Sequence, residues 1–364
     1  MYREILDGIN KPSSYYMEES LKKLDSLIKP LKSLGHLETI ASKICSINET
    51  LTPKIDKRIV VVMASDNGVC EEGVASAPQS VTAMQTINFL RGISGISVIT
   101  RNNNTDLRVI DVGVNADISY KGLENKKVRY GTRNSAKEAA MTKEECIKAI
   151  EVGINTIKSI KNDGYSIVGT GEMGIGNTTT SSSLLIMLTG CSVEEAVGRG
   201  AGLSDEQFNK KKEVIQSIIN LHSEEGITPF ESLRRVGGYD LAALTGMYLG
   251  AAYYRIPIVI DGFISIVAAL CAYEMNPICR EYMFASHISV ERGYNIAVQR
   301  LNIRPMLNLD MRLGEGTGCP LAFNIIDTSC SIIREMGTFE DGNVDLKDYK
   351  DHWREDNDIS NRRG

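Results

Sequence analysis

Short apolar runs alternate along the chain with longer segments in which apolar residues recur at helical spacing. The runs that predict buried parallel strands cover residues 59–64, 107–112, 166–169, 256–261, 284–287 and 306–310. The longer segments predict helices at 15–50, 81–90, 142–160, 183–188, 204–221, 241–253 and 320–333. Strand, loop and helix thus recur in order, which favours an α/β fold with a parallel sheet and helices on both faces.

Four segments refine this pattern. The apolar run 95–100 predicts a further strand, consecutive with or paired to 107–112. The helix at 142–160 begins with the capping box Thr142-x-x-Glu145. The apolar stripe along 15–50 suits a dimer or cap element, but we expect it to pack against the core. Residues 341–364 form an acidic tail with few apolar residues, which we expect to be disordered or draped over the surface.

Composition narrows the class of protein. The chain has 364 residues, 42% of them hydrophobic and 24% charged, which suits one large globular domain plus a smaller one. A net charge of −5 argues against a nucleic-acid binder. Residues 1–32 lack the features of a signal or transit peptide, and no apolar run is long enough to span a bilayer. We therefore expect a cytoplasmic protein.

Cysteine and histidine usage bears on metal binding. The eight cysteines are scattered without a C-x-x-C pair, and the four histidines are scattered too. We therefore expect free thiols in a reducing compartment, and neither a zinc site nor another metal site.

The densest polar motif is Gly171-Glu172-Met173-Gly174-Ile175-Gly176-Asn177-Thr178-Thr179-Thr180, which follows a predicted strand and precedes a predicted helix. Glycines permit positive φ and close approach of a ligand, and free N–H groups at a helix start attract an anion, most often phosphate. Asn177 or Thr178 can cap the helix and still offer a side chain to a phosphate. The spacing is neither that of a P-loop nor that of the dinucleotide fingerprint. A tight turn without a ligand is the alternative, but the density of glycines and polar groups favours a binding site.

Two further glycine clusters accompany this turn. Gly198-Arg199-Gly200-Ala201-Gly202-Leu203 precedes a predicted helix that carries Lys210, Lys211 and Lys212. A lysine there can neutralise a phosphate, although each of the three is more often on a solvated helical face. The third cluster, Arg312-Leu313-Gly314-Glu315-Gly316-Thr317-Gly318, has a carboxylate at its centre.

Glu172 and Glu315 both follow predicted strands, so they can meet at the carboxyl edge of one sheet. Because a carboxylate beside a phosphate is electrostatically costly, Glu172 should face another part of the ligand. Two carboxylates, a phosphate cradle and no metal cluster suggest chemistry on a phosphorylated sugar. Asp66 follows the strand at 59–64 and is either a ligand contact or an Asx-turn residue. A lone histidine such as His287 is more often structural than catalytic.

Several of these motifs, in this order, resemble the nicotinate-nucleotide–dimethylbenzimidazole phosphoribosyltransferase family, whose members make the lower-ligand nucleotide of cobalamin. The similarity extends from about residue 15 to about residue 335. It is carried by Gly171 to Thr179, Gly198 to Leu203, Arg235-Val236-Gly237-Gly238, Val259 to Ser265, Ser286-His287 and Asp310 to Gly318. The resemblance implies a Rossmann-like large domain at 51–318, a small helical domain from 1–50 with 319–340, and a homodimer.

The resemblance also implies an activity: transfer of the phosphoribosyl group of nicotinate mononucleotide to a benzimidazole, with inversion of a β- to an α-glycoside. By motif match, Glu315 is the general base and Glu172 stabilises positive charge on the ribose. The residues that hold the nucleotide phosphate are Gly174, Gly176, Asn177, Thr178, Gly202 and Lys211. The base pocket contains Gln85, Leu313, Ala77 and Asp66. No cofactor or metal is implied, because nicotinate leaves from a cationic pyridinium and no pyrophosphate departs.

Four positions depart from the family pattern, namely Asn67, Ala77, Arg292 and Tyr294. Ala77 leaves space where the family is often bulkier, so we expect several benzimidazoles and related bases to be accepted. Two other functions remain as alternatives: hydrolysis or phosphorolysis of a nucleotide glycosidic bond, and binding of a nucleotide without catalysis. Retention of both Glu172 and Glu315 weighs against a non-catalytic protein.

Overall fold

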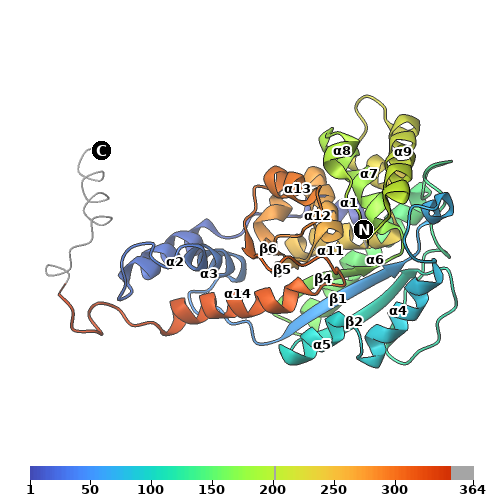
Figure 1. Ribbon diagram of the computed structural model, residues 1–364. Helices are drawn as coiled ribbons and strands as arrows, with labels where there is room; N and C mark the ends of the chain where they lie inside the picture. The colour runs from blue at the N-terminus through green and yellow to red at the C-terminus, as the bar shows by residue number, and fades with distance from the viewer. Residues whose placement is uncertain (201, 346–364) are drawn as a thin grey trace. The chain divides into compact units, whose positions relative to one another are not determined.

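The computed structural model describes residues 1–200 and 202–345, and within them seven strands form one parallel sheet (Figure 1). The strand order is β3-β2-β1-β4-β5-β6-β7. The strands are β1 Arg58–Ser65, β2 Asp106–Gly113, β3 Leu123–Asn125, β4 Ile167–Met173, β5 Ile258–Ile260, β6 Met283–His287 and β7 Pro305–Leu307. The predicted α/β fold is confirmed, and β3 is a strand that the apolar runs did not indicate.

Strand β1 lies inside the sheet, and its residues 59–65 are buried because both faces of the sheet are covered. It pairs in parallel with β2 on one side and with β4 on the other. The chain therefore leaves β1 toward one edge of the sheet and later returns to build the other edge. In open parallel sheets such a reversal opens a crevice at the carboxyl ends of the strands.

Helices connect and cover the strands. They are α1 Tyr2–Asp7, α2 Ser14–Ser26, α3 His36–Asn48, α4 Ser80–Arg91, α5 Gly95–Asn102, α6 Lys143–Asn162, α7 Asn177–Thr189, α8 Val193–Ala196, α9 Asp205–His222, α10 Pro229–Val236, α11 Tyr239–Tyr253, α12 Phe263–Met275, α13 Tyr294–Leu301 and α14 Gly318–Glu335, with 3-10 helices η1 Gly68–Glu72 and η2 Pro277–Tyr282. Helices α11 and α12 contact the strands on one face, and α4 and α5 lie on the other (Figure 1).

The predicted helices at 81–90, 142–160, 204–221, 241–253 and 320–333 are confirmed, including the capping box of Thr142 and Glu145. Two predictions are wrong in detail. Residues 95–100 form α5 instead of a strand, because Ser94 caps a helix there by accepting from the backbone N–H of Ser97. Short apolar runs do not distinguish the two structures by periodicity alone. The stripe at 15–50 forms two helices, α2 and α3, separated by a turn in which Lys32 and Gly35 have positive φ.

Helix α11 packs close to α6, with glycines at the contact. A Cβ at Gly153 of α6 would lie 1.9 Å from the backbone oxygen of Ala243, and one at Gly246 of α11 would lie 2.0 Å from that of Ile150. Both glycines are therefore required for the two backbones to approach, which sets the position of the helical layer over the sheet.

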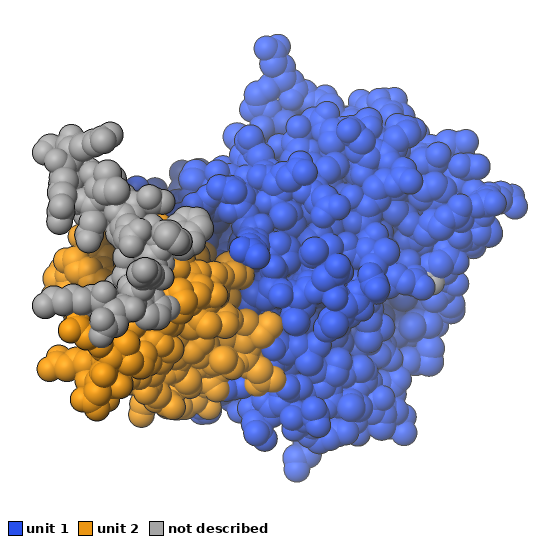
Figure 2. All heavy atoms as spheres, turned by 60° about the vertical axis from the view of Figure 1, so that its left-hand side comes forward, with its two compact units in different colours: residues 1–11, 57–322 blue, residues 12–56, 323–364 orange. Residues whose placement is uncertain are grey.

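The chain divides into two compact units (Figure 2). The first contains residues 1–11 and 57–322, and with them the whole sheet. The second contains residues 12–56 and the chain from residue 323 on, with α2 and α3. Its core includes the buried Leu24, Leu27, Ala41, Cys45 and Ile333. The domain boundaries expected from the sequence stay a prediction, and most of the predicted acidic tail, from residue 346 on, lies outside the described residues.

Candidate active site

A cavity of about 270 Å³ lies in the sheet-containing unit, where loops that follow five strands converge. The loops follow β1, β4, β5, β6 and β7, and a segment around Arg199 completes the lining. Nine residues predicted for the site line it, namely Ala77, Gln85, Glu172, Gly174, Gly176, Asn177, Thr178, Leu313 and Glu315. Gly202, Lys211 and Asp66 are not among the described residues that line it.

Glu315 occupies the loop after β7 in the left-handed backbone region, with φ of +62°. Its neighbours Gly314 and Gly316 have φ of +78° and +94°, values that favour glycine. The side chain is 7% exposed, and both of its oxygens are hydrogen-bonded. Gln85 donates from Nε2 to Oε1 at 2.7 Å, and the backbone N–H of Ile96 donates to Oε2 at 3.1 Å.

The contact with Ile96 places the Glu315 carboxylate at the N-terminus of α5. Free N–H groups and the helix dipole favour negative charge at this position. Gln85 comes from α4, and its own amide oxygen accepts from Asn88 at 3.3 Å, which orients it. The strand predicted at 95–100 did not indicate this partner, because the free N–H group that meets Glu315 belongs to the first turn of a helix.

Glu172 is the second-last residue of β4 and lies beside the Glu315 loop. A Cβ at Gly314 would lie 2.4 Å from Glu172 Oε1, and the backbone N–H of Glu315 hydrogen-bonds to the Glu172 carboxyl. Asn177 donates to Glu172 Oε2 and also, at 3.2 Å, to Asp240 Oδ2. The structure thus brings together two carboxyl groups that are 143 positions apart along the chain (315 − 172).

Burial raises the pKa of Glu172 to about 8, and the nearby Asp240 and Asp261 carboxylates add to this effect. The hydrogen bonds from Asn177 and from the backbone of Glu315 oppose it. In the absence of a cationic ligand, Glu172 is therefore mostly protonated at neutral pH. A positively charged group placed against it favours the ionised form.

The glycine turn after β4 leads directly into α7. Gly176 is the N-cap with φ of +87°, and a Cβ there would lie 2.5 Å from Cys70 Sγ. The side chain of Thr178 points toward Lys211, whose Nζ donates to Thr178 Oγ1 at 2.9 Å. Lys211 is 1% exposed, and burial lowers its pKa to about 8 while Glu291 opposes that change. The Thr178 side chain therefore separates Lys211 from the cavity.

Gly202 and Asp66 are placed differently from the expectation. Gly202 is exposed with φ of +113°, and no described atom lies within 4 Å of a Cβ built there. Asp66 is 2% exposed, and its Oδ2 accepts from the backbone N–H of Asn115 at 2.8 Å. This contact joins segments 49 positions apart, so it is not the local Asx-turn that was the alternative to a ligand contact.

Leu313 and Ala77 belong to the apolar part of the lining. Leu313 is 60% exposed, although it is a large apolar residue. A Cβ at Gly95 would lie 2.6 Å from Leu313 Cδ2 and 3.2 Å from Glu315 Oε2. An apolar surface therefore lies beside the Glu315 carboxylate, which suits a flat aromatic ligand that also carries an N–H group.

Several residues that line the cavity were not predicted from the sequence, among them Asp261, Ser289, Glu291 and Arg312. Asp261 directly follows β5, so a carboxylate after a buried strand was the signal that could have found it. Burial raises its pKa to about 7, against hydrogen bonds from backbone N–H groups. His287 also lines the cavity, and burial lowers its pKa to about 4, so it is neutral at physiological pH.

Two observations on the described residues bear on other kinds of site. Over 1–200 and 202–345, no three His, Cys, Asp or Glu side chains are arranged to hold a metal ion. In the same ranges no helix combines the length and the apolar character needed to cross a bilayer.

Comparison with known proteins identifies the family of the chain. A family model described as "Phosphoribosyltransferase" matches residues 9–344. A nicotinate-nucleotide–dimethylbenzimidazole phosphoribosyltransferase of Clostridium perfringens is 49% identical over 354 residues, which cover 96% of this chain and 98% of the relative. The chain belongs to this phosphoribosyltransferase family. An equally named enzyme of Clostridium acetobutylicum is 48% identical over 346 residues, covering 95% and 98% of the two chains.

Solved structures agree with this family assignment. The crystal structure of CobT from Thermus thermophilus has a TM-score of 0.88 and 36% sequence identity, and the match covers 91% of this chain and 99% of that chain. A second structure from the same organism, titled as the same kind of phosphoribosyltransferase, has a TM-score of 0.87 and 34% identity, with 92% of this chain and 99% of that chain covered. These structures confirm the family resemblance inferred from the motifs, and they confirm the α/β fold of this phosphoribosyltransferase.

Proposed function

We propose that this phosphoribosyltransferase transfers the phosphoribosyl group of nicotinate mononucleotide to 5,6-dimethylbenzimidazole or a related base. The products are α-ribazole 5'-phosphate and nicotinate, as needed for the nucleotide loop of cobalamin. The observation that carries the proposal is the Glu315 carboxylate, held by Gln85 and Ile96 beside an apolar wall, in the same cavity as Glu172 and the glycine turn. Relatives that are nearly half identical bear the name of this reaction.

The glycine turn and Lys211 hold the phosphate end of the nucleotide. Backbone N–H groups at the start of α7 favour an anion. Lys211 adds positive charge to this site, either through its hydrogen bond to Thr178 or by direct contact with the phosphate beyond that side chain. A phosphate drawn to this point keeps Lys211 charged despite its burial. Gly174, Gly176 and Asn177 complete this part of the site. Gly202 is not part of the cavity lining, so it contributes to phosphate binding only when its loop approaches the ligand.

Glu315 accepts the proton that the attacking base loses. One ring nitrogen of the benzimidazole forms the new bond to C1′ of the ribose, while the other nitrogen gives its proton to a Glu315 oxygen. Each carboxylate oxygen can accept more than one hydrogen bond, so Gln85 and Ile96 leave capacity for the substrate N–H. The bond from C1′ to the pyridinium breaks, and its electron pair neutralises the ring nitrogen of nicotinate.

Glu172 stabilises the positive charge on the reacting sugar. In this role the Glu172 carboxyl must be ionised. The raised pKa keeps it protonated in the free protein, so binding of the cationic nucleotide has to displace the proton from Glu172. Charge that develops on the ribose in the transition state then meets a carboxylate in a buried site, where electrostatic stabilisation is strong.

Product analysis with nicotinate mononucleotide, with and without 5,6-dimethylbenzimidazole, tests this proposal. Nicotinate and α-ribazole phosphate should appear together, in equal amounts, only when the base is present. Release of nicotinate without the base would instead establish a hydrolase, or a phosphorylase if inorganic phosphate is required. Nucleotide binding without any release would establish a non-catalytic protein.

We further propose that the protein acts as a homodimer in the cytoplasm, because the family resemblance implies a dimer and all eight cysteines are free thiols, as is typical of a reducing compartment. Sedimentation velocity over a range of concentrations tests the oligomeric state. A single species of 40.0 kDa at all concentrations would refute the dimer.

A further inference from the structure

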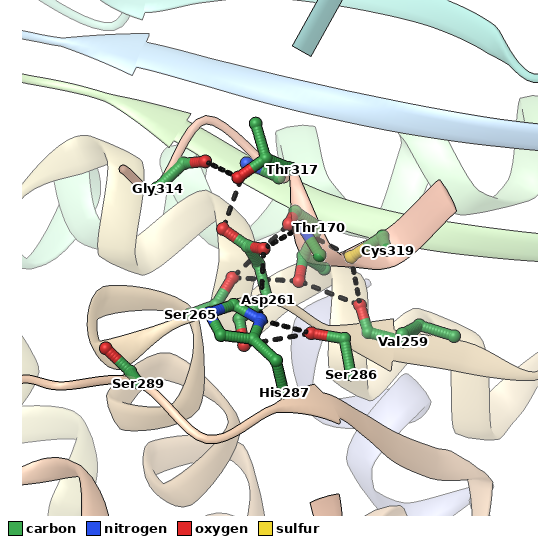
Figure 3. Close-up of polar contacts among 12 residues, drawn as sticks. Thr170, Val259, Asp261, Ser265, Ser286, His287, Ser289, Gly314, Thr317 and Cys319 are labelled. Carbon is green, nitrogen blue, oxygen red and sulfur yellow. Dashed lines mark hydrogen bonds and ion pairs between the residues drawn. The ribbon is translucent and has the colours of Figure 1, made fainter. Parts of the chain in front are cut away.

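The loop that carries Glu315 is fastened to the end of a different strand. Asp261 follows β5, and its two carboxylate oxygens accept hydrogen bonds from two backbone N–H groups of the loop. Gly316 donates to Oδ2 at 3.0 Å, and Gly318 donates to Oδ1 at 2.7 Å. These two donors lie immediately beyond Glu315, so Asp261 fixes the direction of the chain just after the carboxylate. Figure 3 shows Asp261 between this loop and the side chain of His287.

The loop needs such a fastening because its backbone is unusual. Three consecutive residues, 314–316, have positive φ, and the central one is not glycine. A non-glycine residue in this region is disfavoured and persists only when its surroundings hold it. Inside the loop, Thr317 donates from both its backbone N–H and its hydroxyl to the Gly314 oxygen, at 3.1 and 2.9 Å. These bonds close the turn, but they do not attach it to the sheet.

The other side of Asp261 is also held in place. Ser286 Oγ lies 2.9 Å from His287 Nδ1 and 3.2 Å from the backbone oxygen of Asp261. A Cβ at Gly318 would lie 2.2 Å from His287 Nδ1, so the loop rests directly on the ring. Because His287 is neutral, its 3.9 Å separation from Asp261 Oδ1 is no ion pair at neutral pH. The neutral His287 ring therefore supports the loop by packing against it.

We infer that Asp261 is a positioning residue for the transfer reaction, which acts by holding the Glu315 carboxylate where it meets the N–H of the attacking base. This inference rests on the proposed function, since Glu315 is taken as the proton acceptor. Asp261 does not accept the proton itself, because both of its oxygens are directed to the loop. General-base catalysis depends on placement within hydrogen-bond reach, so loss of the fastening lowers turnover without removing the base.

The test variant is Asp261→Asn, whose amide keeps one acceptor oxygen and presents a donor to the other loop N–H. We expect kcat to fall by roughly 30- to 100-fold, as for a catalytic group displaced by about 1 Å, with KM for nicotinate mononucleotide changed less than about threefold. The matched control is Asp111→Asn. Asp111 lies near the end of β2, away from the cavity, and its Oδ1 accepts from the N–H groups of Gly113 and Val114 at 3.0 and 2.9 Å, while its Oδ2 pairs with Lys127 Nζ at 2.8 Å. It should lose stability but keep its turnover.

A double-mutant cycle with Glu315→Gln decides whether Asp261 acts through Glu315. In the Glu315→Gln background, Asp261→Asn should cost less than about threefold in kcat, because the base that it positions is already absent. A loss as large as in the parent protein would overturn the inference. So would a loss confined to KM for the nucleotide, which would make Asp261 a substrate contact.

Hydrogen exchange measured by mass spectrometry tests the fastening independently of activity. Asp261→Asn should speed exchange in peptides that cover 314–318, whereas Asp111→Asn should speed it only around 113–114. If the parent protein does not transfer phosphoribosyl at all, the proposed function fails, and exchange alone then decides whether Asp261 holds the loop. Unchanged exchange at 314–318 would refute the fastening. If Asp261→Asn does not fold, Asp261→Ser, which keeps one acceptor oxygen, replaces it.

Discussion

Replacing Glu315 by Gln removes the proposed proton acceptor and keeps the size of the side chain. In the structure, the two carboxylate oxygens accept from Gln85 Nε2 and from the backbone N–H of Ile96. The Ile96 donor is fixed by α5, so the glutamine oxygen should take that place and its NH₂ group should face Gln85. The amide of Gln85 can rotate to present its oxygen, at the expense of the bond from Asn88.

The cost to stability should be moderate. Two hydrogen bonds to a charged group, each contributing about 1.5–3 kcal/mol, are replaced by two neutral ones worth about 1 kcal/mol each. We expect the fold to persist and the nucleotide to bind with nearly unchanged affinity, because the phosphate contacts lie at the glycine turn. Turnover should fall by at least about a hundredfold, since general-base assistance contributes typically about 10²–10⁴-fold.

The assay follows nicotinate and α-ribazole phosphate by chromatography, at saturating nucleotide and several concentrations of base. Calorimetric titration with the nucleotide, in the absence of base, checks that binding is retained. An N-methylated imidazole needs no deprotonation, so with this acceptor, if the cavity admits it, the variant should lose far less. Near-normal turnover of Glu315→Gln on 5,6-dimethylbenzimidazole would remove Glu315 from the mechanism and leave Glu172 as the candidate.

Four further predictions concern the other groups of the cavity. Nucleotide affinity should rise between about pH 6 and 8, by up to roughly tenfold per pH unit, because burial raises the pKa of Glu172 to about 8 and a cationic ligand requires the ionised form. Glu172→Gln should flatten this dependence, and an equally steep profile in the variant would refute the assignment. The folded protein retains this proton between about pH 4.5 and 8, where the unfolded chain releases it, so its unfolding free energy should fall as pH rises through that window. Urea unfolding at pH 6 and pH 8 should show a smaller fall in Glu172→Gln than in the parent. Lys211→Ala should raise KM for the nucleotide by about 10- to 150-fold, the equivalent of roughly 1.5–3 kcal/mol, with little effect on KM for the base. The exposed Lys210 on the same helix is the control, and equal effects of the two substitutions would count against a phosphate contact. Because Ala77 lines the cavity with a small side chain, several benzimidazoles should compete as acceptors, and Ala77→Phe should narrow the range by removing space. A competition assay in which only 5,6-dimethylbenzimidazole reacts in the parent protein would contradict this expectation.

Local patterns in the sequence were sufficient for the elements that depend on local chemistry. The buried strand β1 is a continuous apolar run because both faces of a parallel sheet are covered. The start of α6 was visible because a capping box satisfies N–H groups within three residues. The glycine turns before Asn177 and around Glu315 were visible because positive φ selects glycine. Because the ends of parallel strands share one edge, the meeting of Glu172 with Glu315 could also be anticipated.

The partners of these residues were decided only by the tertiary structure. Glu315 is held by Gln85 and Ile96, which lie 230 and 219 positions away, and no local pattern links them. The run at 95–100 is helical because Ser94 caps it and because an N-terminal N–H group there meets a buried carboxylate. Asp261 reaches the Glu315 loop across 55 and 57 positions.

Lys211 shows the same division between local and tertiary information. Its position after a glycine cluster was readable in the sequence, but its burial behind Thr178, which lowers its pKa to about 8, follows from packing against α7. The sequence determined which residue types stand at the ends of strands and at the starts of helices, because those choices depend on the backbone conformation of a few neighbouring residues. Which donor meets which carboxylate, and how strongly each group is desolvated, was decided by tertiary packing, because hydrogen bonding and burial act between segments that are distant in the chain.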